Sequence, residues 1–147
     1  MFELDRFVVA QEPVYENFVA ELRAGRKRTH WMWFVFPQLD GLGASAMARR
    51  YAISGLAEAR AYSGHGVLGP RLVECATLVL GHRGKRVRSI MGSPDDLKLH
   101  SSMTLFEVAT PDEPAYAAVI DAFYDGRRDD RTLQLLGSGR DPSLRSG

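Results

Sequence analysis

The sequence RKRTHWMWFVFPQLDGLG, residues 26–43, contains both tryptophans of the chain and two of its phenylalanines. Apolar residues occupy both sides of a period-2 pattern, so this segment is expected to be buried all round and not to form one face of a helix. Pro37 ends any helix before it. The segment therefore predicts a short buried aromatic connector between helices, with a polar rim formed by His30, Gln38 and Asp40.

Apolar residues with helical spacing occur on both sides of this connector, and glycine, proline and serine separate the runs. No internal repeat and no convincing β-hairpin is found. The sequence thus predicts an all-α fold, a single compact domain of about seven to eight helices over residues 1–137, followed by a disordered tail over residues 138–147. The helices are expected at about 4–10, 13–25, 45–53, 54–62, 67–80, 93–109, 116–125 and 130–137, with the helix at 67–80 placed centrally. Ser54 is expected to cap the helix that follows it, and Asp130 or Thr132 the last one.

Composition and charge exclude several classes of protein. The chain has 147 residues, 45% hydrophobic and 25% charged, which is typical of one soluble globular domain. Nineteen basic and eighteen acidic residues give a net charge of +1, which argues against nucleic acid as a partner unless a local patch meets it. The single Cys75 excludes an internal disulfide, and no residue spacing predicts a metal or cofactor site. Without a signal sequence or membrane-length apolar run, a cytoplasmic location is expected and membrane partners are not.

The segment SPDDLKLHSSM, residues 93–103, carries the candidate catalytic carboxylates. Ser93 is expected to cap a helix, with Pro94 in its first position, and Asp95 and Asp96 would favour the positive helix end. Capping alone would explain both acids. Alternatively, one carboxylate serves the helix dipole at the surface while the other turns inward, towards the aromatic connector and its basic neighbours, as a general base or electrostatic partner.

Further polar and aromatic residues are candidates for ligand binding, each with a structural alternative. A tryptophan can stack on a base or fill the core, and a histidine beside aromatics can be structural. A serine within a helix can simply bond to the preceding turn. A basic cluster after a helix can be solvated or can hold phosphate. The ligand-binding candidates are Arg28, His30, Trp31, Trp33, Gln38, Lys98, Ser101 and Ser102.

Four segments in this order closely resemble the bacterial domain of unknown function 1810 family: DRFVVAQ, ELRAGRKRTHWMWFVFPQLDGLG, VLGPRLVEC and GSPDDLKLHSSMTLF. The resemblance covers residues 5–136 and implies membership of a family whose activity is unknown. Some members carry the label calpastatin, which implies a protease inhibitor. The sequence has none of the long disordered repeats of the eukaryotic inhibitor of that name, so this label does not carry over.

A fainter resemblance links the chain to the small helical NADAR proteins, which act on ADP-ribose N-glycosides. It rests on the length of the helical domain, the early aromatic segment and a later acid-containing loop, and no residue here aligns with that family's catalytic glutamate. It implies a hydrolase for an ADP-ribose-type or other nucleotide-sugar N-glycoside, with Asp95 or Asp96 as the acid-base group and Trp31 or Trp33 as a stacking wall. The alternative is a non-catalytic module that binds a metabolite or a protein.

Overall fold

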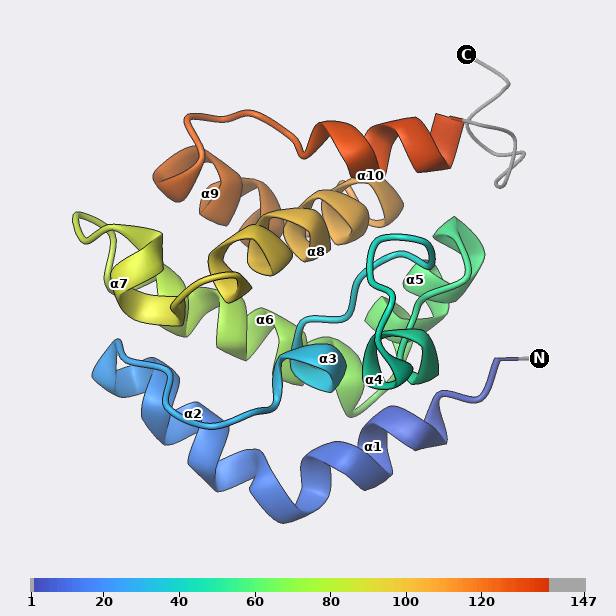
Figure 1. Cartoon of the computed structure of the whole chain (residues 1–147), viewed down its shortest axis with the longest axis horizontal. Helices are drawn as coiled ribbons and strands as arrows, with labels where there is room; N and C mark the ends of the chain where they lie inside the picture. Colours follow the sequence, from blue (N-terminus) through green and yellow to red (C-terminus); the bar gives the residue numbers. More distant parts are fainter. Residues whose placement is uncertain (1, 138–147) are drawn as a thin grey trace.

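Two long helices form the centre of the molecule in a computed structural model, which describes residues 2–137 (Figure 1). Helix α8 packs against α5, α7, α9 and α10, and α6 packs against α2, α5 and α9. Within the described residues the structure is all-α, as predicted. Its elements are α1 (Asp5–Gln11), the 3-10 helix η1 (Glu12–Val14), α2 (Tyr15–Ala24), α3 (Met32–Val35), α4 (Ala46–Arg50), α5 (Leu56–Gly64), α6 (Leu68–Leu80), α7 (Val87–Met91), α8 (Asp95–Ala109), α9 (Pro114–Phe123) and α10 (Asp130–Leu135).

Helix α8 is buried on almost all sides, which explains its central place. Leu99, Met103 and Phe106 have no exposed surface, and hydroxyl side chains between them are buried as well. Helix α6 is amphipathic, and the side chains along its inner face, which include Cys75, are buried. The helix predicted at 67–80 therefore has its expected bounds and lies at the centre of the fold together with α8.

The aromatic connector is buried as predicted, but it is not purely extended. Met32–Val35 form one helical turn, α3. The backbone carbonyl of Phe34 in this turn accepts a hydrogen bond of 2.7 Å from the buried Gln11 amide, which also donates to the Tyr62 hydroxyl. Satisfying a buried carbonyl in this way fixes the connector against α1 and α5.

Three helix starts differ from those predicted. Ser93 does not cap α8, because Pro94 occupies the cap position and no side chain caps the helix there. Ser54 does not cap α5, since Gly55 takes that position. The cap of α10 is Asp129, whose carboxylate accepts from the Thr132 amide, and not Asp130 or Thr132 itself. The short helices α3 and α7 also raise the number of α-helices in residues 2–137 above the predicted seven to eight, whereas α4 lies within the helix predicted at 45–53.

The described part of the chain has no helix long and apolar enough to cross a membrane. The predicted tail, residues 138–147, lies outside the described residues.

Candidate functional site

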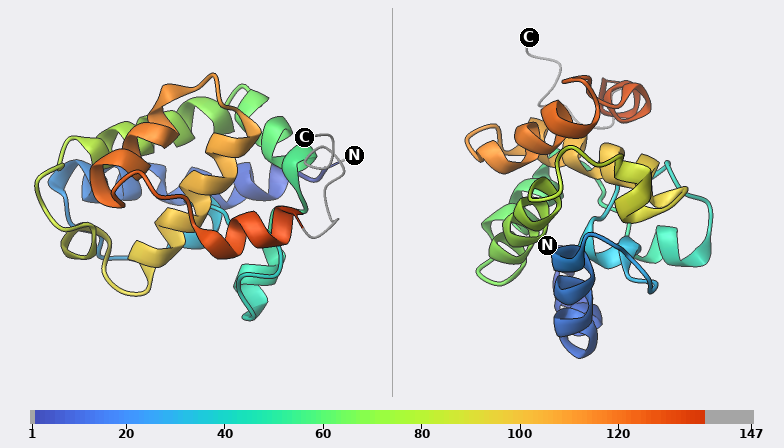
Figure 2. Two further views of the ribbon diagram at one scale, coloured as in Figure 1. Left: turned by 90° about the horizontal axis from the view of Figure 1, so that it is seen from above. Right: turned by 90° about the vertical axis from the view of Figure 1, so that its left-hand side faces the viewer.

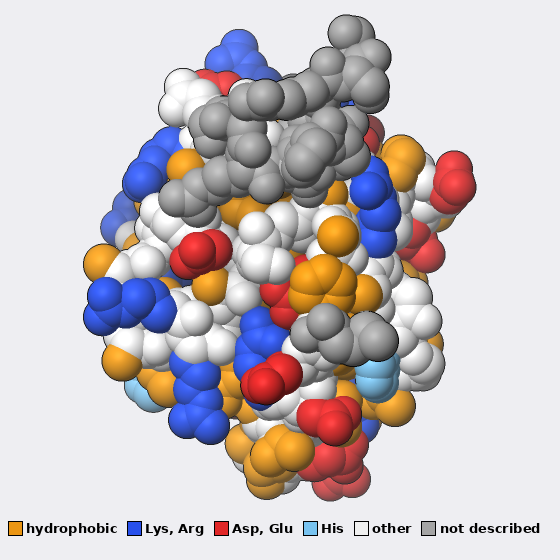
Figure 3. Space-filling model, turned by 90° about the vertical axis from the view of Figure 1, so that its right-hand side faces the viewer, with side chains coloured by type: hydrophobic (Ala, Val, Ile, Leu, Met, Phe, Trp, Pro, Cys, Tyr) orange, Lys and Arg blue, Asp and Glu red, His pale blue; other side chains and the backbone are white. Residues whose placement is uncertain are grey.

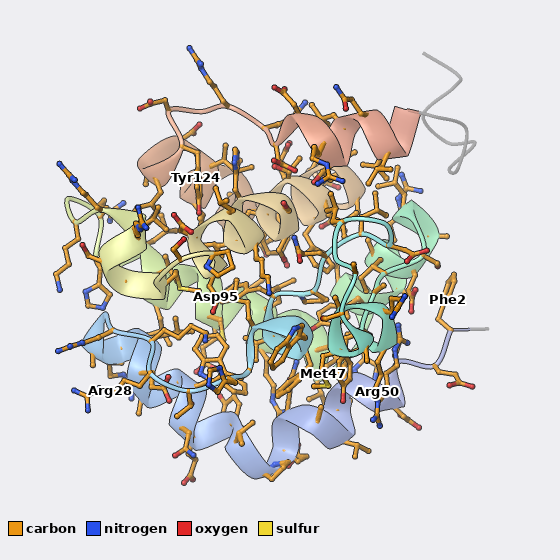
Figure 4. All side chains as sticks on the ribbon, in the orientation of Figure 1. Phe2, Arg28, Met47, Arg50, Asp95 and Tyr124 are labelled. Atoms are coloured by element: carbon orange, nitrogen blue, oxygen red, sulfur yellow. The ribbon has the colours of Figure 1, made fainter. Side chains whose placement is uncertain are left out.

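Asp95 is the acid that turns towards the aromatic connector. Its Oδ2 lies 2.8 Å from Nζ of Lys27, whose side chain is only 7% exposed. The same ammonium lies 4.8 Å from the ring centroid of Trp31 and donates to the Thr29 carbonyl at 2.6 Å. Figure 4 labels Asp95 at the start of α8, above the connector. The expected inward acid is thus Asp95, and the structure gives it an ion pair that ties α8 to residues 27–31.

Asp96 lies beside Tyr124, which follows α9, and it is not the acid in open solvent that the outward acid was expected to be. Its Oδ1 is buried and has no hydrogen-bond partner among the described residues. The Tyr124 hydroxyl donates to the Asp96 backbone carbonyl at 2.5 Å. Burial, and to a smaller extent the charge of Asp96, raises the pKa of Tyr124. The ring of His100 stacks on Tyr124 at 4.1 Å, so this side of α8 is a packed contact between helices.

A cleft of about 440 Å³ opens beside Lys98, where the loop after the connector meets α8 and the start of α10. Ligand pockets have volumes of about 300 to 1,000 Å³, so this cleft can hold a small molecule. It contains three of the ligand-binding residues predicted from the sequence, Gln38, Lys98 and Ser101. The other lining residues are Leu42, Gly43, Ala44, Ser45, Ala48, Pro94, Leu97, Asp129 and Arg131.

Asp129 is the carboxylate of this cleft, and sequence reasoning missed it. Its Oδ2 accepts from the Ser101 hydroxyl at 3.1 Å, from the Thr132 hydroxyl at 2.6 Å and from the Thr132 amide at 3.1 Å. Its own amide donates to the buried Thr104 hydroxyl at 2.9 Å. Three hydrogen bonds therefore hold the side chain of Asp129 and a fourth holds its backbone, and their partners are Ser101 and Thr104 of α8 and Thr132 of α10. The only signal in the sequence was an acid followed by Asp130 at a helix start.

Trp33 lies next to the cleft but does not line it. It borders a much smaller hollow of about 10 Å³, which shares Gln38, Gly43, Ala48 and Lys98 with the cleft. A space of this size holds at most one water molecule, so this hollow itself cannot hold a ligand beside the half-buried Trp33 ring. Nζ of Lys98 lies 5.7 Å from the ring centroid of Trp33 and 3.9 Å from Oδ1 of Asp95. Lys98 therefore stands between the connector, Asp95 and the cleft.

The remaining predicted site residues lie apart from this cleft. Trp31 is 1% exposed and belongs to the core, and Ser102 is fully buried with no hydrogen-bond partner for its Oγ among the described residues. Arg28 and His30 are exposed, at the other end of the connector. The structure thus brings together Gln38, Lys98 and Ser101 and separates them from these four.

Larger hollows also occur in the described residues, and their charges distinguish them from the cleft. One of about 540 Å³ near the start of α1 has two carboxylates, Glu3 and Asp5, against Arg6. A groove of about 930 Å³ between α5, α6 and α9 is lined by three carboxylates, Glu74, Asp112 and Glu113, against one cation, Arg60. An anionic ligand would be repelled there. A hollow of about 770 Å³ around α10 shares Asp129 and Arg131 with the cleft, but the ion pair of Arg128 with Glu107 occupies its wall. The cleft offers the better combination of cations, hydroxyls and an amide for a phosphorylated ligand.

Comparison with known proteins gives a family and a solved fold. The model of the family described as Protein of unknown function (DUF1810) matches residues 1–136. The chain is also similar to the conserved hypothetical protein Rv1873 from Mycobacterium tuberculosis, whose crystal structure is known. The two share 58% sequence identity over 92% of this chain and 96% of that one, with a TM-score of 0.90. The search of curated proteins found no match.

Proposed function

Because the chain belongs to the DUF1810 family of proteins of unknown function, its role has to come from its own chemistry, and we propose that the cleft beside Lys98 binds a small phosphorylated metabolite of the nucleotide-sugar type. The observation that carries this proposal is the meeting of Gln38, Lys98 and Ser101 with Asp129 and Arg131 in one cleft of about 440 Å³. These side chains come from the connector loop, α8 and the start of α10.

The residue types suit the parts of such a ligand. Lys98 and Arg131 supply positive charge for a phosphate or pyrophosphate. Gln38 can donate to and accept from ribose hydroxyls, and Ser101, whose proton is donated to Asp129, can accept from one. Leu42 and Leu97 add apolar surface, which a base or sugar face can cover.

Hydrolysis of an N-glycoside is the second candidate function, and the position of Asp129 favours it. All three hydrogen bonds to its carboxylate end on Oδ2, which leaves Oδ1 to orient water or stabilise an oxocarbenium ion. In this proposal Asp129 takes the acid-base role first assigned to Asp95 or Asp96. Asp95 then acts through Lys98, which it neighbours at 3.9 Å, as a positioning residue.

A thermal-shift titration with ADP-ribose, ADP and ribose tests the binding proposal. At a concentration a hundredfold above its dissociation constant, a ligand stabilises the folded chain by about 2.7 kcal/mol. Replacing Lys98 by methionine keeps most of the apolar stem of the side chain and removes its charge, which should weaken ADP-ribose binding by about 10-fold to 100-fold. Asp112→Asn, in the acidic groove, is the matched control and should leave the affinity unchanged.

Incubation with an N-glycoside of ADP-ribose in place of ADP-ribose itself, followed by chromatography, separates binding from turnover. A hydrolase should release the aglycone from a nucleotide-sugar N-glycoside, and Asp129→Asn should lose turnover while it still binds the ligand. Binding without turnover in the unmodified chain would support the non-catalytic module. If neither ADP-ribose nor ADP raises the melting temperature at millimolar concentration, the binding proposal is contradicted.

A further inference from the structure

One end of the molecule carries seven exposed cationic side chains from two segments that are far apart in the sequence. One segment comprises the last turn of α2 and the residues after it. The other joins α6 to α7 and extends into α7. In Figure 1 both lie on the left, and Figure 2 shows this side facing the viewer in its right-hand view. The seven residues, here called the basic face, are Arg23, Arg26, Arg28, Arg83, Lys85, Arg86 and Arg88.

Specific contacts hold the two segments of the basic face together. Nε2 of His82 lies 3.0 Å from the carbonyl oxygens of both Leu22 and Arg23. The Lys27 amide donates to the Ile90 carbonyl at 2.7 Å. Gly25 ends α2 with a φ of +72°, and a Cβ at this position would lie 2.7 Å from the His82 ring. The glycine therefore allows both the left-handed turn and the close approach of His82.

The charge of the basic face is not neutralised within the described part of the chain. The ion pairs found among the described residues are made by cations outside the basic face: Arg6, Lys27, Arg71, Lys98 and Arg128. Residues 22–30 and 81–94 contain no acid. Of the acids next to these segments in the sequence, Glu21 is engaged by hydrogen bonds from residues 28–31, and Asp95 by Lys27.

Charge is therefore distributed very unevenly over the molecule. The whole chain carries only +1, so without the seven cations of the basic face it would carry −6. Figure 3 shows the opposite end, where acidic and basic side chains alternate over the surface. The net charge near zero, which argued against a polyanionic partner, conceals this asymmetry.

We propose that the basic face binds the phosphodiester backbone of nucleic acid, independently of the metabolite cleft. Six of its seven cations are arginines, whose planar guanidinium matches phosphate geometry and always carries its charge. Rows of such contacts give binding that follows the backbone without reading the sequence.

The apolar surface of the chain separates this partner from the other polyanions. The exposed large hydrophobic residues of the described chain are Phe2, Val9, Val67 and Leu97, and none belongs to the basic face. Attachment to an anionic membrane normally combines charge with apolar side chains that enter the lipid, and a protein partner normally needs an apolar or aromatic centre. The basic face offers charge alone, which suits nucleic acid best.

Fluorescence anisotropy with labelled oligonucleotides of about 20 nucleotides tests this proposal, with single-stranded RNA, single-stranded DNA and duplex DNA as separate arms. At about 50 mM salt the chain should bind at least one of them. The affinity should fall steeply as the salt concentration rises: in a plot of log affinity against log salt concentration, each neutralised phosphate should contribute a slope of about −1. Arg83→Glu with Arg86→Glu should weaken binding at least about tenfold and reduce this slope by about two.

The control is Arg49→Glu with Arg60→Glu, which changes the net charge equally on α4 and α5, at the other end of the molecule. It should retain most of the affinity, provided that circular dichroism shows both double variants folded. Equal weakening by the two double variants would show that only net charge matters and would overturn the proposal. So would the absence of binding to every oligonucleotide at about 50 mM salt, or binding to vesicles with anionic lipid but not to oligonucleotides.

Discussion

Replacing Trp31 by alanine should lower the free energy of unfolding by about 3 to 5 kcal/mol, the usual cost of deleting a large aromatic side chain from a core. Trp31 is 1% exposed, and its ring centroid lies 5.7 Å from that of Phe18 and 6.3 Å from that of Phe36. Its indole Nε1 donates to the Glu21 carboxylate at 3.0 Å. The substitution therefore removes packing and a hydrogen bond together.

Trp33→Ala is the matched control in the same segment. Trp33 is only half-buried, and it packs against the edge of the core. Its loss should cost about 1 to 2 kcal/mol. Chemical denaturation of both variants measures the difference. Losses below about 1 kcal/mol for Trp31→Ala, or equal losses for the two variants, would show that the connector does not organise the core.

Glu21→Gln should destabilise the fold by about 2 kcal/mol at neutral pH, because Glu21 holds the chain between α2 and the connector. Its Oε1 accepts from the Arg28 and Thr29 amides and from Trp31 Nε1, and its Oε2 accepts from the Thr29 hydroxyl at 2.5 Å. Burial alone would raise the pKa of Glu21, but these hydrogen bonds outweigh it and lower the pKa from 4.5 to about 2. The uncharged amide of glutamine keeps the shape and loses the charge that strengthens them.

The pH dependence of this effect distinguishes the charge of Glu21 from its packing. Because the folded-state pKa lies below the ordinary value of 4.5, the carboxylate contributes its full stabilisation above pH 4.5 and loses it as the pH falls towards 2. The cost of Glu21→Gln should therefore shrink over this interval. Glu16→Gln, an exposed glutamate on the same helix, should cost little at any pH. A cost for Glu21→Gln that stays constant down to pH 2 would contradict the role of the charge.

Most of the helical fold could be predicted because its long helices have clear periodicity and clear ends. Helix α6 begins and ends within a residue of its prediction. The one-turn helix α3 could not be predicted, since a segment buried on nearly all sides gives no amphipathic signal to separate a helix from an extended strand. The cap at Ser93 failed because Pro94 occupies the cap position itself, where its side chain has no group to accept a hydrogen bond.

The candidate site was only partly predictable, because a cleft depends on how distant elements meet. Gln38, Lys98 and Ser101 were recognisable as polar groups beside apolar segments. Asp129 was not, since it looks like an ordinary helix cap until α10 is placed against Ser101 and Thr104. Glu21 was missed for the same reason, because its four donors belong to a loop that folds back over α2. The basic face was hidden by the near-zero net charge of the whole chain.

A titration of the isotope-labelled chain with ADP-ribose, followed by amide chemical shifts, tests the central proposal most directly. If the cleft beside Lys98 binds the nucleotide-sugar, the largest shifts should occur at Gln38, Gly43, Lys98, Ser101 and Asp129. Smaller shifts should follow in α10, which Asp129 caps. Largest shifts in the acidic groove, at Gly69 and Tyr116, or no saturable shifts at all, would contradict the proposal.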